Sequence, residues 1–462
     1  PEWGKGFDTV PYKVCDWWNY GGIVRDVALV PRPPVHLAGG VGEFSPEGDS
    51  LTVRAWVRNA SPEAARGVLE ASLYPLRMEA KNRASPLVAA LAEEGRPLRV
   101  RLRPALGWTF PPGKTVMVET QLTLLDPLQS WSPESPNLYA LRLRLLPRPR
   151  QVGDELWLQV GYRKLEVGPT PPYLFLNGLP LRLAGANRHE ELPEVYRATT
   201  WEDGERLWPD LERLKALGAN FLRLAHYPNH PLLPMLCDRI GLALWEEIPV
   251  YWFDGSALLR ALEQGIGQQM WLEMLYRDAS RPSILFWGAC NECSGQEERA
   301  RFLRRLRELA AQYGGPRLMG QSAVGLHPTD PTQRECDVVG FTFYYGVFYG
   351  KDAEADTWAA LEQAAHAFPG RPILVTEFGY WAHPQGTEGE KQARIAEATL
   401  RALTRHPAVA GMAWWCAYDY HTFHTRINTM GLWTFDRATR RPVAEVLARA
   451  WAAWRHLPFP AP

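Results

Sequence analysis

Hydrophobic and polar residues follow two different patterns along the chain, and the change lies near Gly168. Between residues 35 and 167, apolar and polar residues alternate in short runs that proline and glycine separate. A period of two is typical of strands that bury one face. The clearest runs are residues 51–57, 116–120 and 138–143. We therefore predict an antiparallel sandwich with one short helix near residues 85–94.

A different pattern follows residues 168–172. Short apolar runs now alternate with longer stretches in which apolar residues recur every three or four positions. Strands are predicted at residues 181–185, 221–224, 242–245, 284–287, 317–320, 338–343, 373–376 and 409–415. The predicted helices include residues 203–217, 258–280, 297–311, 357–368, 390–404 and 443–454. This order predicts a (β/α)8 TIM barrel.

Composition excludes several classes of protein. The chain has 51 basic and 51 acidic side chains, so no basic surface for nucleic acid is expected. With 46% hydrophobic and 22% charged residues, it is not a disordered chain. No apolar run reaches the roughly 18 residues of a membrane span, so no membrane partner is expected. The six cysteines are scattered, which favours buried thiols over a disulfide framework. Oligomeric state stays open, and a cytoplasmic location is favoured.

Polar and aromatic residues follow most of the predicted barrel strands. In such barrels the active site lies at the C-terminal ends of the strands. The residues found there are Asn187, Arg188, His189, Glu190, His226, His230, Glu246, Glu247, Asn291, Glu292, Tyr344, Tyr345, Glu377, Trp415 and Asp419.

Two carboxylates among them point to glycoside hydrolysis. Glu292 follows the fourth strand and Glu377 ends the seventh, so the two face each other across the barrel. Hydrolysis of a glycoside needs one protonated carboxyl as general acid and one ionised carboxylate. A single glutamate at a strand end could equally be a surface ion-pair residue, but two of them within an aromatic rim favour catalysis.

The histidines also allow a metal site, which the spacing disfavours. His226 and His230 are four residues apart, but Pro228 lies between them, so they are not expected to share a helical face. We expect no metal and no cofactor, and we assign His189 and His226 to contacts with sugar hydroxyls. A hydrolytic metalloenzyme that uses Glu247 and the histidines is the remaining alternative.

Two further residues suit a site of this kind. Arg223 ends an apolar strand, where an unpaired charge would be costly, so it should pair with a carboxylate of the site. Tyr344 and Tyr345 could be core residues, but the hydroxyl of one of them near Glu377 would lower the pKa of that carboxyl.

Several motifs resemble glycoside hydrolase family 2, the β-galactosidase and β-glucuronidase family. They are Asp16-Trp17-Trp18-Asn19-Tyr20-Gly21-Gly22-Ile23, Trp131-Ser132-Pro133-Glu134-Ser135-Pro136-Asn137-Leu138-Tyr139, Gly161-Tyr162-Arg163, Gly185-Ala186-Asn187-Arg188-His189-Glu190, Arg223-Leu224-Ala225-His226-Tyr227-Pro228-Asn229-His230-Pro231, the acid/base motif Arg281–Glu292 and the nucleophile motif Thr376-Glu377-Phe378-Gly379.

The resemblance implies three domains. These would be a remnant of a jelly-roll sugar-binding domain at 1–34, an immunoglobulin-like β-sandwich at 35–168 and a catalytic TIM barrel at 169–462. It also implies that Glu292 is the general acid/base and Glu377 the nucleophile of a retaining double displacement. Asn291 would bind the sugar 2-hydroxyl and Tyr344 would bond to the nucleophile. His189, His226 and Trp415 would line the sugar pocket above Arg223.

Departures from the family pattern bear on the substrate. Where β-glucuronidases carry Asn-x-Lys, the chain has Asn428-Thr429-Met430, so an anionic sugar loses its counter-charge. Where magnesium-dependent β-galactosidases carry Glu-x-His, it has Glu247-Ile248-Pro249, and Thr342 replaces a common Asn. We expect an exo-β-glycosidase with β-galactoside favoured. The alternatives are a β-glucuronidase, a β-mannosidase or a silent carbohydrate-binding protein.

Tryptophan is unusually frequent, with 20 residues against 16 Phe. Trp17, Trp18 and Trp131 fall in the domain-closing motifs, and we expect them to pack. Others lie near the predicted barrel mouth, where flat rings suit the apolar faces of sugars. Of these, Trp415 is the one that we assign to sugar contact.

Overall fold

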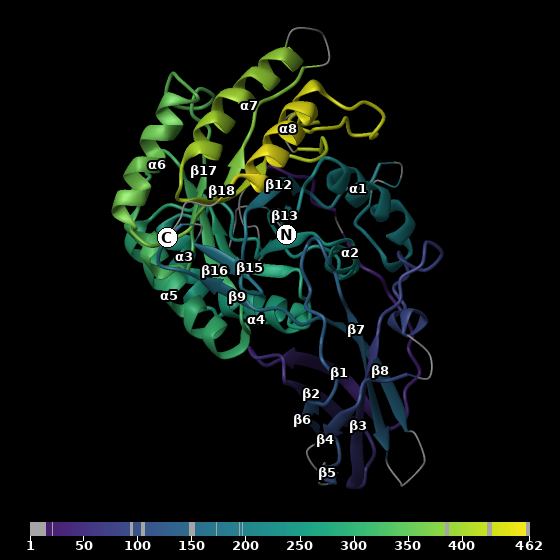
Figure 1. The fold of residues 1–462 in the computed structure, drawn as a ribbon. Helices are drawn as coiled ribbons and strands as arrows, with labels where there is room; N and C mark the ends of the chain where they lie inside the picture. Colours follow the sequence, from purple (N-terminus) through teal and green to yellow (C-terminus); the bar gives the residue numbers. More distant parts are fainter. Residues whose placement is uncertain are drawn as a thin grey trace.

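The computed structural model describes residues 15–20, 22–92, 96–102, 107–146, 153–171, 173–193, 195, 197–383, 388–422 and 427–458. Two antiparallel four-stranded sheets lead into a closed eight-stranded parallel barrel, and helices surround the barrel (Figure 1). The two sheets form a separate lobe beneath the barrel in that view.

The two antiparallel sheets share one hydrophobic core. One has the order β1-β2-β6-β4 and the other β5-β3-β7-β8. The strands are β1 Val35–Phe44, β2 Ser50–Asn59, β3 Ala65–Pro75, β4 Val100–Leu102, β5 Trp108–Phe110, β6 Thr115–Leu124, β7 Tyr139–Leu146 and β8 Asp154–Val160. Every second residue of β2 is buried, as the alternation predicted. An immunoglobulin-like relationship and the domain boundaries stay predictions.

The short helix predicted at residues 85–94 is only a four-residue 3-10 turn, η1 Val88–Leu91. Residues 93 and 94 of that prediction lie outside the described part of the chain.

A hydrogen-bonded interface joins the antiparallel sheets to the bottom of the barrel. It includes the small sheet of β9 Leu165–Val167, β10 Leu174–Leu176 and β11 Leu179–Pro180. The indole of Trp131, fully buried as expected, donates a 2.8 Å hydrogen bond to the carbonyl of Asp238. Arg163 donates to the carbonyls of Pro282 at 3.0 Å and Ile284 at 2.8 Å. These bonds satisfy backbone groups at the start of a barrel strand.

The barrel contains all eight predicted strands. They are β12 Leu183–Arg188, β13 Phe221–Leu224, β14 Ala243–Glu247, β15 Ile284–Asn291, β16 Leu318–Val324, β17 Val339–Thr342, β18 Ile373–Phe378 and β19 Val409–Trp414. Pairing of β19 with β12 closes the ring. Their residues are nearly all buried, since helices cover the outside and side chains fill the inside.

The helices differ from prediction at two places. They are α1 Gly204–Ala216, α2 Leu232–Ile240, α3 Gly255–Glu263, α4 Ile266–Asp278, α5 Gln296–Tyr313, α6 Ala355–Ala367, α7 Glu388–Arg405 and α8 Pro442–His456. The single helix predicted at 258–280 is wrong, because Gly265 has a left-handed φ of 73° and separates α3 from α4. Helix α2 was missed because almost all of its residues are buried, which leaves no polar stripe. None of the described helices meets the length and hydropathy of a membrane span.

The described part of residues 15–34 crosses the mouth of the barrel. Arg25 forms a bidentate ion pair with Glu190, at 2.8 and 2.7 Å. Asp26 lies 2.8 Å from Nε2 of His230. Trp17 is buried, whereas Trp18 is 50% exposed and packs edge-on against His421, with ring centroids 5.3 Å apart. The jelly-roll origin of this segment stays a prediction, and its residues 1–14 and 21 lie outside the described part.

Candidate active site

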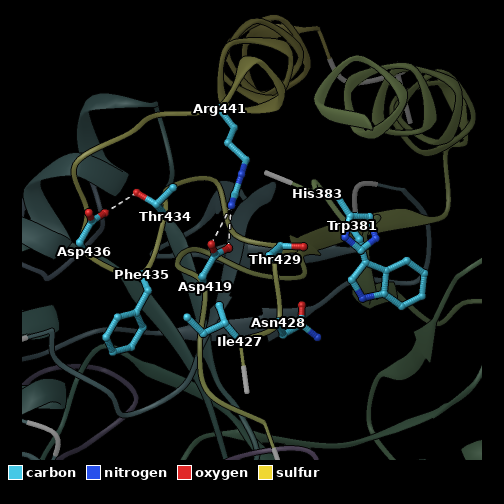
Figure 2. A pocket seen from close by; sticks show the side chains of 10 residues that line it. All are labelled: Trp381, His383, Asp419, Ile427, Asn428, Thr429, Thr434, Phe435, Asp436 and Arg441. Atoms are coloured by element: carbon cyan, nitrogen blue, oxygen red, sulfur yellow. Dashed lines mark hydrogen bonds and ion pairs between the residues drawn. The ribbon is translucent and has the colours of Figure 1, made fainter. Parts of the chain in front are cut away.

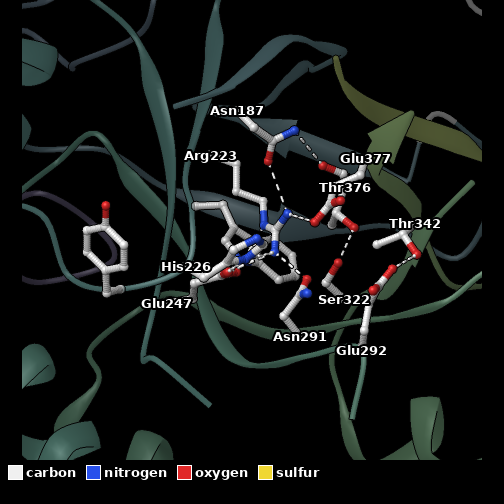
Figure 3. Close-up of polar contacts among 12 residues, drawn as sticks. Asn187, Arg223, His226, Glu247, Asn291, Glu292, Ser322, Thr342, Thr376 and Glu377 are labelled. Carbon is white, nitrogen blue, oxygen red and sulfur yellow. Dashed lines mark hydrogen bonds and ion pairs between the residues drawn. The ribbon is translucent and has the colours of Figure 1, made fainter. Parts of the chain in front are cut away.

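Arg223, at the C-terminal end of β13, organises the site (Figure 3). Its Nη1 donates to Glu377 at 2.6 Å and to Asn187 at 3.0 Å. Its Nη2 donates to Glu247 at 2.7 Å and to Asn291 at 2.8 Å, and its Nε donates to Glu247 at 2.9 Å. All five N–H groups of the guanidinium therefore have an acceptor. The buried charge is paired with carboxylates, as the sequence predicted.

Glu377, on β18, has a donor on each carboxylate oxygen. Arg223 reaches Oε1 at 2.6 Å, and the hydroxyl of Tyr344 donates to Oε2 over 2.9 Å. Burial raises the pKa of Glu377 to about 8, with Glu292 adding to the rise, while Arg223 and Tyr344 act to lower it. The Tyr344 hydrogen bond thus acts in the predicted direction, but desolvation outweighs it.

Glu247, at the end of β14, lies beneath the site. It accepts from Arg223, and its Oε1 is 2.8 Å from Nδ1 of His226. Although burial alone would raise it, Arg223 and His226 hold the pKa of Glu247 below its usual range. Burial lowers the pKa of His226 to about 4, so its imidazole is neutral near pH 7. Because a carboxylate only accepts, Nδ1 carries the proton and Nε2 remains as an acceptor.

Glu292 follows β15 and has a backbone φ of 47°, in the left-handed region. Thr342, the last residue of β17, donates its hydroxyl to Oε1 over 2.6 Å. The indole of Trp252 donates to Oε2 over 2.8 Å. This carboxylate is therefore held by a hydroxyl and an indole, whereas Glu377 is held by a guanidinium and a phenol.

An aromatic wall closes one side of the site. His226 stacks on Trp415 with ring centroids 5.0 Å apart. His189 lies against Trp415 at 5.3 Å and Tyr420 at 4.2 Å. Trp17, from the segment that crosses the mouth, packs on His189 at 5.8 Å and on His226 at 5.6 Å. Burial and the nearby cations keep the pKa of His189 far below its usual value, so this ring is also neutral.

Other polar residues at the rim turn away from the two carboxylates. His230 pairs with Asp26, whereas His226 pairs with Glu247, so the two histidines have different partners. Glu246 pairs with Arg277 on α4, and the Tyr345 hydroxyl donates to the carbonyl of Gly325. The described residues contain no cluster of three or more groups that could hold a metal ion.

A cavity of about 850 Å³ lies beside the loop that follows β19 (Figure 2). Asp419 pairs with Arg441 in its wall, at 2.6 and 2.7 Å. Asn428, from the stretch that lacks the Lys, also lines it. Its amide donates to the Tyr420 hydroxyl at 3.1 Å, and so supports the aromatic wall.

The structure brings all eight predicted site residues to the barrel mouth. These are Glu292, Glu377, Asn291, His189, His226, Arg223, Tyr344 and Trp415. Sequence reasoning missed the contact of Trp252 with Glu292 and assigned Trp17 to packing alone. Both tryptophans lie in segments that have no hydrophobic periodicity. Only the family motif around Trp17 and the position of Trp252 shortly after a predicted strand could have indicated these contacts.

Comparisons with known proteins agree on the family. The family model described as "Glycosyl hydrolases family 2, TIM barrel domain" matches residues 170–399. A "Beta-galactosidase" of Thermoanaerobacter pseudethanolicus is 27% identical over 65% of this chain and 38% of its own length. A "Beta-galactosidase" of Vibrio vulnificus is 31% identical over 60% of this chain and 25% of its own length. The chain thus matches well under half of these relatives.

Among solved structures, a family 2 β-galacturonidase from Eisenbergiella tayi has a TM-score of 0.81 at 22% identity. That likeness covers 97% of this chain and 77% of the other. At this identity the structural likeness shows a shared fold. The match to the family model shows that the barrel is related to this family. The chain belongs to glycoside hydrolase family 2.

Proposed function

We propose that the chain is a retaining exo-β-glycosidase that removes a terminal β-linked sugar by double displacement. The observation that carries the proposal is the pair Glu292 and Glu377, held by different donors at one barrel mouth. Family membership supports the reaction class. The donors on Glu377, a guanidinium and a phenol, stabilise a carboxylate and so suit a nucleophile.

In the first step, Glu377 attacks the anomeric carbon while the glycosidic C–O bond breaks. The proton of Glu292 passes to the departing oxygen, so the leaving group departs as a neutral alcohol. Asn291, whose Oδ1 accepts from Arg223, presents its amide N–H groups for the sugar 2-hydroxyl. A contact of this kind gains strength in the transition state.

In the second step, water attacks the anomeric carbon and the bond to Glu377 breaks. Glu292, now ionised, takes a proton from that water, and Glu377 is released as a carboxylate. Two inversions at one carbon give net retention. The neutral imidazoles of His189 and His226 are suited to bind sugar hydroxyls, and Nε2 of His226 can accept a hydrogen bond from one.

The charge distribution favours a neutral sugar. Arg223, the cation that reaches both Glu247 and Glu377, has every N–H group occupied. A uronate carboxylate would therefore find no free guanidinium N–H at this point, beside two carboxylates that repel it. The relatives named β-galactosidase support the choice of a β-galactoside as the preferred substrate. The aromatic wall, in which His226 packs between Trp415 and Trp17, bounds one side of the site and so suits exo action.

A panel of chromogenic β-galactoside, β-glucuronide, β-mannoside and β-glucoside tests the proposal. We expect hydrolysis with preference for the galactoside, and loss of turnover in Glu377→Gln. Preference for the glucuronide would overturn the substrate assignment. Binding of sugars without any turnover would favour the alternative, a silent carbohydrate-binding protein.

A further inference from the structure

Trp252, in the loop between β14 and α3, has an unusual backbone and an unusual exposure. Its φ is 55°, a region that bulky side chains rarely adopt. The residue is 49% exposed, although a tryptophan normally gains stability by burial. Packing therefore does not explain why this conformation is kept. A non-glycine residue held at positive φ is a reason to look for function.

The loop is fixed against the acid/base strand. The backbone N–H of Trp252 donates to the carbonyl of Asn291 at 3.0 Å. One face of the indole stacks on Tyr251, with centroids 4.6 Å apart and an angle of 23° between the planes. These two contacts aim the indole N–H at Oε2 of Glu292, 2.8 Å away. The half-exposed Trp252 is thus hydrogen-bonded to the carboxyl that would protonate the leaving group.

The chemistry of this hydrogen bond suits an acid that loses its proton. An indole N–H can donate but not accept, so Oε2 of Glu292 acts as the acceptor in this hydrogen bond. The bond becomes charge-assisted, and about twice as strong, when Glu292 is ionised. It therefore stabilises the state in which the proton has moved to the glycosidic oxygen.

We propose that Trp252 is a specificity-determining residue of the leaving-group subsite, and that this subsite takes a ring, either a second sugar or an aryl group. The exposed indole surface lies beside the carboxyl that must touch the glycosidic oxygen. The first ring beyond that oxygen then reaches the indole. Sugar C–H faces and aryl rings both pack on an aromatic surface, whereas a methyl group covers little of it. The inference rests on the proposed function and adds the leaving-group specificity.

Two variants separate the roles of the N–H and the ring. Trp252→Phe keeps an aromatic face but removes the donor. Trp252→Gly removes both, and glycine adopts the observed φ without strain, so folding is protected. Substrates share the sugar that the wild-type enzyme prefers and differ in leaving group: a disaccharide, a methyl glycoside and a 2,4-dinitrophenyl glycoside, whose phenolate leaves without acid assistance.

For Trp252→Phe, we expect kcat on the disaccharide and the methyl glycoside to fall about tenfold, the worth of one hydrogen bond to a charged group. The dinitrophenyl substrate should stay within about twofold of wild type in kcat/KM, because this ratio reports the first step and the phenolate leaves without a proton. For Trp252→Gly, KM on the disaccharide should also rise, by about fivefold from lost ring packing. KM on the methyl glycoside should not change.

Trp157 in β8 provides a matched control. It is a partly exposed tryptophan whose indole donates to Glu155 at 2.5 Å, and it lies in the antiparallel sheets rather than the barrel. Trp157→Phe should leave all three substrates unchanged. Equal losses on all three substrates in Trp252→Phe, or an unchanged disaccharide KM in Trp252→Gly, would overturn the inference alone. An inactive wild-type chain would overturn the proposed function and this inference with it.

Discussion

The hydroxyl of Tyr344 donates a 2.9 Å hydrogen bond to the Oε2 oxygen of Glu377. The bond joins a residue that follows β17 to a residue of the neighbouring β18. Burial raises the pKa of that carboxyl to about 8, and the Tyr344 bond opposes the rise. The ionisation of Glu377 is thus set by a balance between desolvation and two donors.

Tyr344→Phe should shift the pH profile to higher pH. A nucleophile must be ionised, so kcat/KM rises with pH through the pKa of Glu377. Without the hydroxyl, the carboxylate is less stabilised, its pKa rises and the acidic limb moves upward. The measurement is kcat/KM on an aryl β-glycoside between pH 5 and 10. A limb that stays in place, or moves downward, would show that Tyr344 does not tune Glu377.

Glu292→Ala should slow substrates in proportion to their need for acid. General acid catalysis contributes about 10²–10⁴-fold, so an alkyl glycoside should lose that much in kcat. A dinitrophenyl glycoside should form the glycosyl-enzyme at near wild-type rate and then accumulate it, because no base activates water. Azide should restore turnover and give a β-glycosyl azide. Equal losses on both substrates, without azide rescue, would remove Glu292 from this role.

Arg223→Met should cost stability. It would leave Glu247 and Glu377 buried without their counter-charge, and breaking a buried ion pair costs about 3–5 kcal/mol. Arg223→Met combined with Glu247→Gln should recover part of the loss, because one of the uncompensated charges is gone. Urea unfolding at pH 7 measures both. A loss within about 0.5 kcal/mol, the usual range for surface positions, would contradict the account of Arg223.

Gly265→Ala should destabilise the fold by about 1 kcal/mol. A Cβ at this residue meets no atom within 4 Å, so the cost comes from the φ of 73° alone. Gly389, at the start of α7, is also open but has no positive φ. Gly389→Ala is therefore expected to leave stability unchanged or raise it. Thermal unfolding of both variants checks this, and equal effects would mean that backbone strain is not the cause.

The barrel could be predicted from the sequence because its strands are short apolar runs between amphipathic helices. That order also located Glu292 and Glu377, since strand ends of a closed barrel share one rim. The boundaries of the helices were harder to predict from the sequence. The break at Gly265 depends on one φ angle, which a hydrophobic pattern does not encode.

Contacts between loops were the least predictable part of the site. Trp252 reaches Glu292 only because its own φ is positive and Tyr251 supports its ring. Trp17 packs beside His189 in the aromatic wall, although the two residues are more than 150 positions apart in the sequence. Such contacts follow from tertiary packing, and the local hydrophobic periodicity of the sequence does not predict them. The same holds for Thr342, which was noticed as a departure from the family and proves to bond to Glu292.

The most direct test of the double displacement is to trap the glycosyl-enzyme. A 2-deoxy-2-fluoro β-glycoside with a dinitrophenyl leaving group slows the second step more than the first. Peptide mass spectrometry should then find one fluorosugar covalently attached to the peptide that contains Glu377, and none in Glu377→Gln. Attachment to a different carboxylate, or turnover of ordinary substrate with inversion at the anomeric carbon, would contradict the account.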